Sequence, residues 1–185
     1  MPPSERQLLL DEAAIARTLD RMADDILRQT PDPSRLVLIG VQRRGVELAA
    51  RLARALAKAS GAEVPRGALD ITLYRDDLEV VGPRPLVGPT HLPVALEGRH
   101  AWIVDDVLFS GRTVRAALDE LADFGRPARI GLAVLVDRGG RELPIQADVV
   151  GETVPTTPGD RVDVFVTELD GRDAIEIVRG ARGSP

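Results

Sequence analysis

The sequence predicts an α/β fold with a central parallel sheet flanked by helices. Short apolar segments alternate along the chain with amphipathic segments of helical period, which is the pattern of βα units. Two apolar segments, 35–41 (RLVLIGV) and 101–104 (AWIV), are almost free of polar residues and are typical of strands buried on both faces. The length of 185 residues corresponds to roughly one domain, so we expect a single domain over residues 1–185.

Three segments have the properties of helices. In 11–29, apolar residues recur at intervals of three and four. Segment 45–59 is rich in Ala and Leu and is followed by Ser60-Gly61, a typical helix end. Segment 112–124 has one apolar stripe and precedes a Gly and a Pro. Each of these helices is expected to pack its apolar side on the sheet.

The β structure is expected in segments 35–41, 69–74, 101–104, 130–136, 145–150, 162–168 and 174–178. Between the second and third of these lies a long segment, 75–98, that is punctuated by Gly and Pro. A segment of that length without regular structure is usually functional or mobile, so we expect a flexible arm there. The tail 180–185 is expected to fray.

The composition excludes several classes of protein. The chain has no cysteine and only two histidines, His91 and His100, so thiol catalysis, disulfides and multi-histidine metal sites are excluded. A formal net charge of -5 argues against a protein that coats nucleic acid through bulk charge. There is no run of about 18 apolar residues and no apolar signal segment at the N-terminus. We therefore expect no membrane partner and a cytoplasmic location.

The segment 104–113 (VDDVLFSGRT) carries the strongest chemical signal. Asp105 and Asp106 follow a buried strand, at the sheet edge where open α/β folds bind ligands. Residues 110–113 (SGRT) lead into a helix, whose free N–H groups form an anion site. This combination fits a ligand with a phosphate at one end and sugar hydroxyls at the other. Taken separately, the acid pair could be a helix-entry turn or a receiver-type phosphoacceptor, and the SGRT turn a simple N-cap.

Segment 104–113 resembles the phosphoribosyl-diphosphate signature of type I phosphoribosyltransferases. Segments 11–27, 69–78 and 135–148 resemble the bifunctional pyrimidine-operon attenuator/uracil phosphoribosyltransferase family, PyrR, and the resemblance covers about residues 9–178. It implies the type I phosphoribosyltransferase fold, with a β-rich hood and a flexible arm. It also implies an enzyme that makes UMP and diphosphate from uracil and 5-phosphoribosyl 1-diphosphate, assembled as a homodimer or a higher homo-oligomer.

The resemblance also implies roles for individual residues. Asp105 and Asp106 would contact the ribose, with a Mg²⁺ ion held mainly by the diphosphate and reached by Asp105 through water. The loop 40–45 (GVQRRG) would bind diphosphate and often contains a cis peptide in this family. The residues that would bind phosphoribosyl diphosphate are Arg43, Arg44, Arg75, Val107, Leu108, Phe109, Ser110, Gly111, Arg112 and Thr113. Those near the base or nucleotide would be Val136, Arg138 and Val162.

Other interpretations of these segments stay open on the residues alone. The loop 40–45 could be a plain βα turn with solvated arginines, and Tyr74-Arg75-Asp76-Asp77 a solvated hairpin with an internal ion pair. Trp102 is expected in the core, and both histidines are expected to be structural or solvated. Two further functions also stay open. One is a messenger RNA-binding attenuator with vestigial catalysis, and the other is a transferase for a purine or orotate.

The sequence departs from the family at positions that would meet RNA. The first helix of the family commonly reads Thr-Arg-Ile-Ala-His, and a later motif reads Arg-Gly-His-Arg-Glu-Leu-Pro-Ile-Arg. Basic or hydroxyl groups are lost at five positions, which here are Asp20, Asp24, Gly140, Gln146 and, in place of a further family lysine, Glu152. Three of them are acidic, and acidic groups repel phosphates. Arg21 and Arg141 remain, so we expect binding of operon leader RNA to be weakened or lost, unless these positions are ordinary solvated surface.

Overall fold

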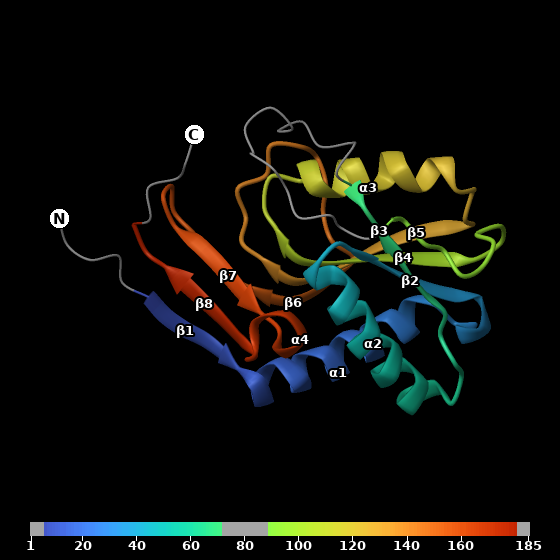
Figure 1. The fold of residues 1–185 in the computed structure, drawn as a ribbon, viewed down its shortest axis with the longest axis horizontal. Helices are drawn as coiled ribbons and strands as arrows, with labels where there is room; N and C mark the ends of the chain where they lie inside the picture. Colours follow the sequence, from blue (N-terminus) through green and yellow to red (C-terminus); the bar gives the residue numbers. More distant parts are fainter. Residues whose placement is uncertain (1–5, 72–88, 181–185) are drawn as a thin grey trace.

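The computed structural model of the protein describes residues 6–71 and 89–180, which form two sheets (Figure 1). The larger sheet is parallel throughout and has five strands in the order β3 (Arg66–Leu69), β2 (Leu36–Val41), β4 (His100–Leu108), β5 (Arg129–Asp137) and β6 (Val149–Thr153). The smaller sheet is antiparallel and has the order β1 (Arg6–Asp11), β8 (Ala174–Val178) and β7 (Arg161–Phe165). A short helix, α4 (Thr167–Asp170), joins β7 to β8, and we call these three strands and α4 the hood. This is the predicted α/β class.

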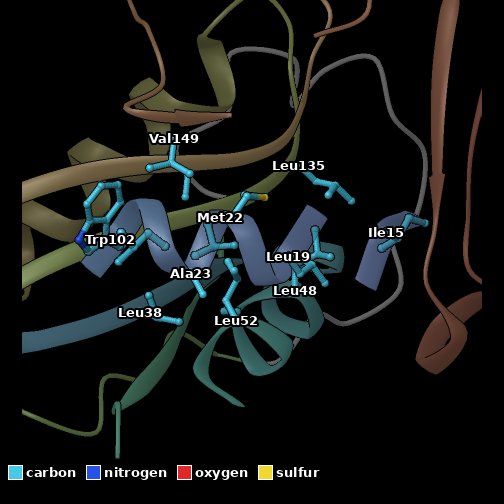
Figure 2. Close-up of a cluster of buried hydrophobic side chains, with 14 of the residues drawn as sticks. Ile15, Leu19, Met22, Ala23, Leu38, Leu48, Leu52, Trp102, Leu135 and Val149 are labelled. Carbon is cyan, nitrogen blue, oxygen red and sulfur yellow. The ribbon is translucent and has the colours of Figure 1, made fainter. Parts of the chain in front are cut away.

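Helices cover both faces of the parallel sheet. α1 (Glu12–Gln29) and α2 (Arg44–Ser60) lie on one face, and α3 (Arg112–Asp123) lies on the other (Figure 1). Between α1, α2 and the sheet is the larger apolar cluster, in which Leu19 and Met22 pack with Leu48 and Leu135 (Figure 2). This cluster continues under the hood strands, whereas a second cluster lies beneath α3. Burial on both faces explains why the central strands are so uniformly apolar.

The helices follow their predicted patterns closely. The buried positions of α1 are those of the predicted stripe, and Asp11 caps the helix by accepting a hydrogen bond from the Ala14 N–H at 2.8 Å. α2 ends at Gly61, which adopts a left-handed conformation with φ 71°. Trp102 is 1% exposed and donates a hydrogen bond to Thr30, which confirms that its ring belongs to the core. Every predicted helix is therefore present within two residues of its expected bounds.

Several strands differ from the prediction. β1 was not predicted; it pairs with β8, at the other end of the chain. Of the strand expected at 69–74, residues 70 and 71 are not strand and 72–74 lie outside the described residues, whereas β3 begins earlier, at Arg66. β6 begins only at Val149; just before it, the Asp148 carboxylate rather than a main-chain carbonyl accepts the Leu132 N–H. Segment 162–168 is strand only to Phe165, after which α4 begins.

The flexible arm predicted at 75–98 does not include its last ten residues. Residues 89–98 pack on the body of the protein, where Leu96 is fully buried and His91 forms an isolated antiparallel bridge with Ala68. Apolar residues spaced among the prolines of this segment explain that packing. The remainder of the predicted arm, 75–88, and the last five residues of the predicted tail, 181–185, lie outside the described residues.

Candidate active site

Two loops meet at the carboxyl edge of the parallel sheet, because β2 and β4 are neighbours. One loop leads from β2 to α2 and the other from β4 to α3. At Gly45, a Cβ atom would lie 2.4 Å from the Val104 carbonyl oxygen, and at Gly40 it would lie 2.5 Å from the Gly45 oxygen. Only glycine permits so close an approach. The start of α2 therefore lies against the residue that precedes Asp105.

The acid pair lies within a strand rather than after it, because β4 continues to Leu108. Asp105 is 6% exposed and Asp106 is partly exposed. The Asp106 N–H donates to Asp105 Oδ1 at 2.9 Å, and the Val107 N–H donates to Asp106 Oδ1 at 2.9 Å. Each carboxylate is thus oriented by the main chain of the next residue, beside the first loop.

The loop that precedes α3 is fixed by another segment of the chain. Gly111 is the N-cap of α3 with φ 93°, a conformation that glycine adopts without strain. The Ser110 carbonyl oxygen accepts the N–H groups of Glu142 and Leu143, at 2.9 and 3.1 Å. Arg112 forms an ion pair with Glu142 at 2.7 Å. Residues 138–145 therefore pack on the expected phosphate loop, and the positive N-terminal end of α3 lies at its end.

The loop between β2 and α2 contains the cis peptide that the resemblance implies, between Gln42 and Arg43. Within the described ranges, the exposed Arg43 side chain forms no hydrogen bond or ion pair. Arg44, in contrast, donates to both carboxylate oxygens of Asp170, with Nη2–Oδ1 2.9 Å and Nε–Oδ2 3.3 Å. The two neighbouring arginines therefore have different surroundings, and Arg75 lies outside the described residues.

The residues expected near the base come from β5, from the position directly after it and from the hood. Val136 and Val162 belong to the larger apolar cluster and are 0% and 8% exposed. The Arg138 guanidinium lies 4.1 Å from the centre of the Phe109 ring and donates to the Asp160 carbonyl oxygen at 2.8 Å. Burial lowers the pKa of Arg138 below its ordinary value, against the opposing effect of Asp160. The structure thus brings together Arg138 and the phosphate loop, which were predicted from separate motifs.

Two aspartates beside the site had no functional prediction. Asp160 accepts the N–H groups of Thr157 and Gly180 and the guanidinium of Arg179, which together hold its pKa well below the usual range. Asp170 binds Arg44. A Thr-x-x-Asp pattern at Thr157 is a local signal for a turn. Neither aspartate, however, has a local signal for its distant partner.

The two arginines expected to contact RNA are both occupied by intramolecular contacts. Arg141 donates to the carbonyl oxygens of Ile145 and Phe109, each at 2.9 Å, and forms an ion pair with Asp137. Arg21 donates to the carbonyl oxygens of Val150 and Gly151. In this structure Arg141 therefore stabilises the segment that packs on the phosphate loop, and Arg21 joins α1 to β6.

The fold and the two loops define a type I phosphoribosyltransferase. A family model for the phosphoribosyl transferase domain matches residues 6–169. Among solved structures, the ternary substrate complex of a mutant hypoxanthine phosphoribosyltransferase from Trypanosoma cruzi has TM-score 0.71 and 25% identity, covering 95% of this chain and 96% of that one.

Sequence relatives narrow the class further. A bifunctional protein PyrR of Chloroflexus aurantiacus is 53% identical and covers 96% of this chain and 97% of its own. One from Thermus thermophilus is 52% identical and covers 91% and 93%. The chain belongs to the PyrR family. None of the helices in the described ranges combines the length and apolar character needed to cross a bilayer.

Proposed function

We propose that this phosphoribosyltransferase transfers the phosphoribosyl group to uracil, forming UMP and diphosphate. The observation that carries the proposal is the convergence of three features at one sheet edge: the acid pair, the loop before α3 and the glycine-bordered loop 40–45. The choice of uracil rests on the resemblance of segments 69–78 and 135–148 to the PyrR family. Whether the acceptor is a pyrimidine or a purine, the transferred group is the same.

In the proposed mechanism, different residues stabilise the two opposite charges that develop on the substrate. Breaking the C1–O bond develops positive charge on the ribose ring and negative charge on the diphosphate. Asp105 and Asp106 would orient the ribose hydroxyls and offset the positive charge, while Arg43 and Arg75 would neutralise the diphosphate. Residues 107–113 would anchor the 5′-phosphate, which fixes C1 against the base nitrogen through remote binding.

The donor set fits a Mg²⁺ ion that is held mainly by its substrate. Within residues 6–71 and 89–180, no group of three or more His, Asp or Glu side chains could hold a metal ion. The acid pair offers two neighbouring carboxylates, and Asp105 is the one expected to contact the Mg²⁺ ion through a water molecule. Mg²⁺ commonly binds in this way, through one or two carboxylates, several waters and substrate phosphates. When bound, it would neutralise charge on the leaving diphosphate.

The base would lie between the main sheet and the hood, near Val136, Arg138 and Val162. Main-chain N–H and C=O groups there could match the alternating donors and acceptors of uracil. The other candidate is a purine, since the structural relative from Trypanosoma cruzi is a hypoxanthine phosphoribosyltransferase. Orotate is the third base to be considered.

Turnover of labelled uracil, hypoxanthine and orotate with phosphoribosyl diphosphate and Mg²⁺ tests the proposal. We expect UMP formation at a kcat/KM at least about 100-fold above the values for the other two bases, because a site that hydrogen-bonds uracil leaves polar groups unpaired when another base binds. Equal or faster turnover of hypoxanthine would overturn the choice of base but not the class of enzyme. No turnover with any of the three bases would favour the alternative, an RNA-binding attenuator with vestigial catalysis.

We also propose that binding of pyrimidine-operon leader RNA is weakened or lost. Asp20, Asp24 and Glu152 are exposed on α1 and β6, the two elements that Arg21 joins. Arg141 is committed to internal contacts. Since phosphate binding depends on free Lys and Arg side chains that displace counterions, this surface should repel RNA.

A gel-shift titration with leader RNA, at low salt and with UMP present, tests this second proposal. We expect no sub-micromolar, sequence-selective complex, and such a complex would overturn it. The matched variant carries Asp20→Thr, Asp24→His and Glu152→Lys, which restores the family's residue types. This variant should bind the leader RNA more tightly than the wild type.

The mass of the protein in solution would test the expected homodimer or higher homo-oligomer.

A further inference from the structure

The hood is joined to α2 at two places by arginine and carboxylate pairs. The first is the bidentate contact of Arg44 with Asp170, in which the two side chains are 36% and 18% exposed. The second lies further along α2, where Arg51 binds Glu168 and Asp173. Arg44 is the first residue of α2 and belongs to the loop 40–45 that we assign to diphosphate. Only the first contact therefore touches that loop.

Asp170 is itself fixed in one position. Its Oδ2 atom accepts the Val166 N–H at 2.8 Å, which ties the carboxylate to the end of β7. Burial would raise the pKa of Asp170, but the Val166 N–H and the Arg44 guanidinium together bring it below its ordinary value. The carboxylate is therefore charged near neutral pH and available to orient Arg44.

The contact connects two parts of the proposed site that are far apart in the chain. α4, which carries Asp170, follows β7, which carries Val162 of the expected base pocket. Arg44 and Asp170 are 126 residues apart in sequence. An ion pair with two hydrogen bonds between planar groups restricts both position and rotation, more than a single bond to lysine would.

We propose that Asp170 is a positioning residue for the diphosphate loop, acting through Arg44. The inference rests on the proposed function of loop 40–45, and it gives Arg44 a role different from the direct diphosphate contact that the resemblance implies. With Asp170 in place, the start of α2 is fixed to the hood, and Arg43 and the loop N–H groups are aligned for diphosphate. Substrate parts that do not reach this loop should not depend on Asp170.

The test variant is Asp170→Asn, since an asparagine oxygen can still accept the Val166 N–H but the charge that binds Arg44 is gone. The matched control is Glu168→Gln, which removes a carboxylate from the same short helix and from its contact with Arg51 of α2. Two ligands are compared by calorimetry with Mg²⁺: inorganic diphosphate, and ribose 5-phosphate, which lacks the diphosphate. The KM for phosphoribosyl diphosphate and kcat are measured in parallel.

We expect Asp170→Asn to weaken diphosphate binding and to raise the KM for phosphoribosyl diphosphate, each about tenfold. Its affinity for ribose 5-phosphate should stay within about twofold of the wild type, and Asp170→Glu should recover part of the loss. Glu168→Gln should leave both affinities unchanged. If Asp170→Asn does not fold, Arg44→Lys gives the same comparison, with a smaller loss expected.

The outcomes separate this inference from the proposed function. If the wild type fails to bind diphosphate, the assignment of loop 40–45 is wrong, and this inference falls with it. If the wild type binds diphosphate and Asp170→Asn binds it equally well, the positioning role alone is overturned. Equal losses for diphosphate and ribose 5-phosphate would also overturn it, since they indicate a general structural effect.

Discussion

The carboxyl edge of the parallel sheet and the hood are fixed in place by different kinds of contact. At the sheet edge, Gly45 brings the backbone of α2 against the Val104 carbonyl, and main-chain N–H groups bind Ser110 and the acid pair. The hood shares the larger apolar cluster, and its polar contacts with α2 are made through the carboxylates that bind Arg44 and Arg51. The position of the first region depends on close backbone packing, and the contact of the second region with α2 depends on charge.

This difference predicts which perturbations each region should resist. Close packing of uncharged backbone changes little with pH or salt, but it does not tolerate added volume. Ion pairs tolerate small changes in volume but weaken when a carboxylate is protonated. Substitutions at the sheet edge should therefore act by shape or by loss of a ligand contact, and those at the hood should show a pH dependence.

The largest effect is expected from Gly45→Ala. The added Cβ would meet the Val104 carbonyl at 2.4 Å, with further backbone atoms of residues 104 and 105 close by. We expect the free energy of unfolding to fall by about 3 kcal/mol or more, measured by urea denaturation. Helix propensity alone would favour alanine by about 1 kcal/mol, so an unchanged or higher stability would refute the close approach.

The next largest effect is expected from Asp105→Asn combined with Asp106→Asn. Both amide side chains can still accept the main-chain N–H groups, so the fold should persist while the charges that we propose to face the ribose are lost. We expect kcat/KM to fall about 100-fold or more, the usual cost of removing one such electrostatic contact. Asp119→Asn, at an exposed site on α3, is the control. Wild-type turnover by a folded double variant would remove the acid pair from the mechanism.

A third prediction concerns the loss of stability at low pH through Asp173, which lies beside the hood. Binding by Arg51, followed by Thr167, lowers the pKa of Asp173 to about 2, from an ordinary value of 3.8. A carboxylate with a lowered pKa in the folded state stabilises the protein above its unfolded pKa, and this contribution is lost as the pH falls. We expect about 2 kcal/mol to be lost between about pH 4 and pH 2.

Urea denaturation of the wild type and of Asp173→Asn across this pH range measures that loss. The difference in stability between them should be largest near about pH 6 and should shrink as the pH falls below about 4. A difference that stays constant with pH would show that Asp173 acts through packing rather than charge. The hood would then resemble the sheet edge, and the contrast between the two regions would fail.

The smallest effect is expected from Thr113→Ala, at the second residue of α3. Loss of one hydrogen bond to a charged phosphate should weaken the binding of phosphoribosyl diphosphate by about 1–2 kcal/mol, measured by calorimetry. Thr153→Ala, at the exposed end of β6, should have no effect. Unchanged affinity in Thr113→Ala would mean that the 5′-phosphate binds elsewhere.

Much of the fold was predictable because its signals are local. The apolar stripe of α1, the glycine end of α2 and the uniform apolarity of β2 are each contained in a single short segment. The predicted start of β6 was too early. Just before the observed start, the Asp148 carboxylate accepts the Leu132 N–H, and a contact between residues so far apart has no local sequence signal. The residue types of the candidate site were predictable for the same reason as the helices, since each motif is continuous in the chain.

The sequence by itself determined the α/β class, the three helices, the core and the motif that places the acid pair beside an anion loop. Only the tertiary structure decided that β1 pairs with β8, that Arg141 binds the loop before α3, and that Arg44 binds Asp170 rather than solvent. These contacts join residues separated by 32 to about 170 positions. A charged side chain has the same local sequence pattern whether it faces water or a partner far along the chain, so its partner is fixed only when packing brings the two together.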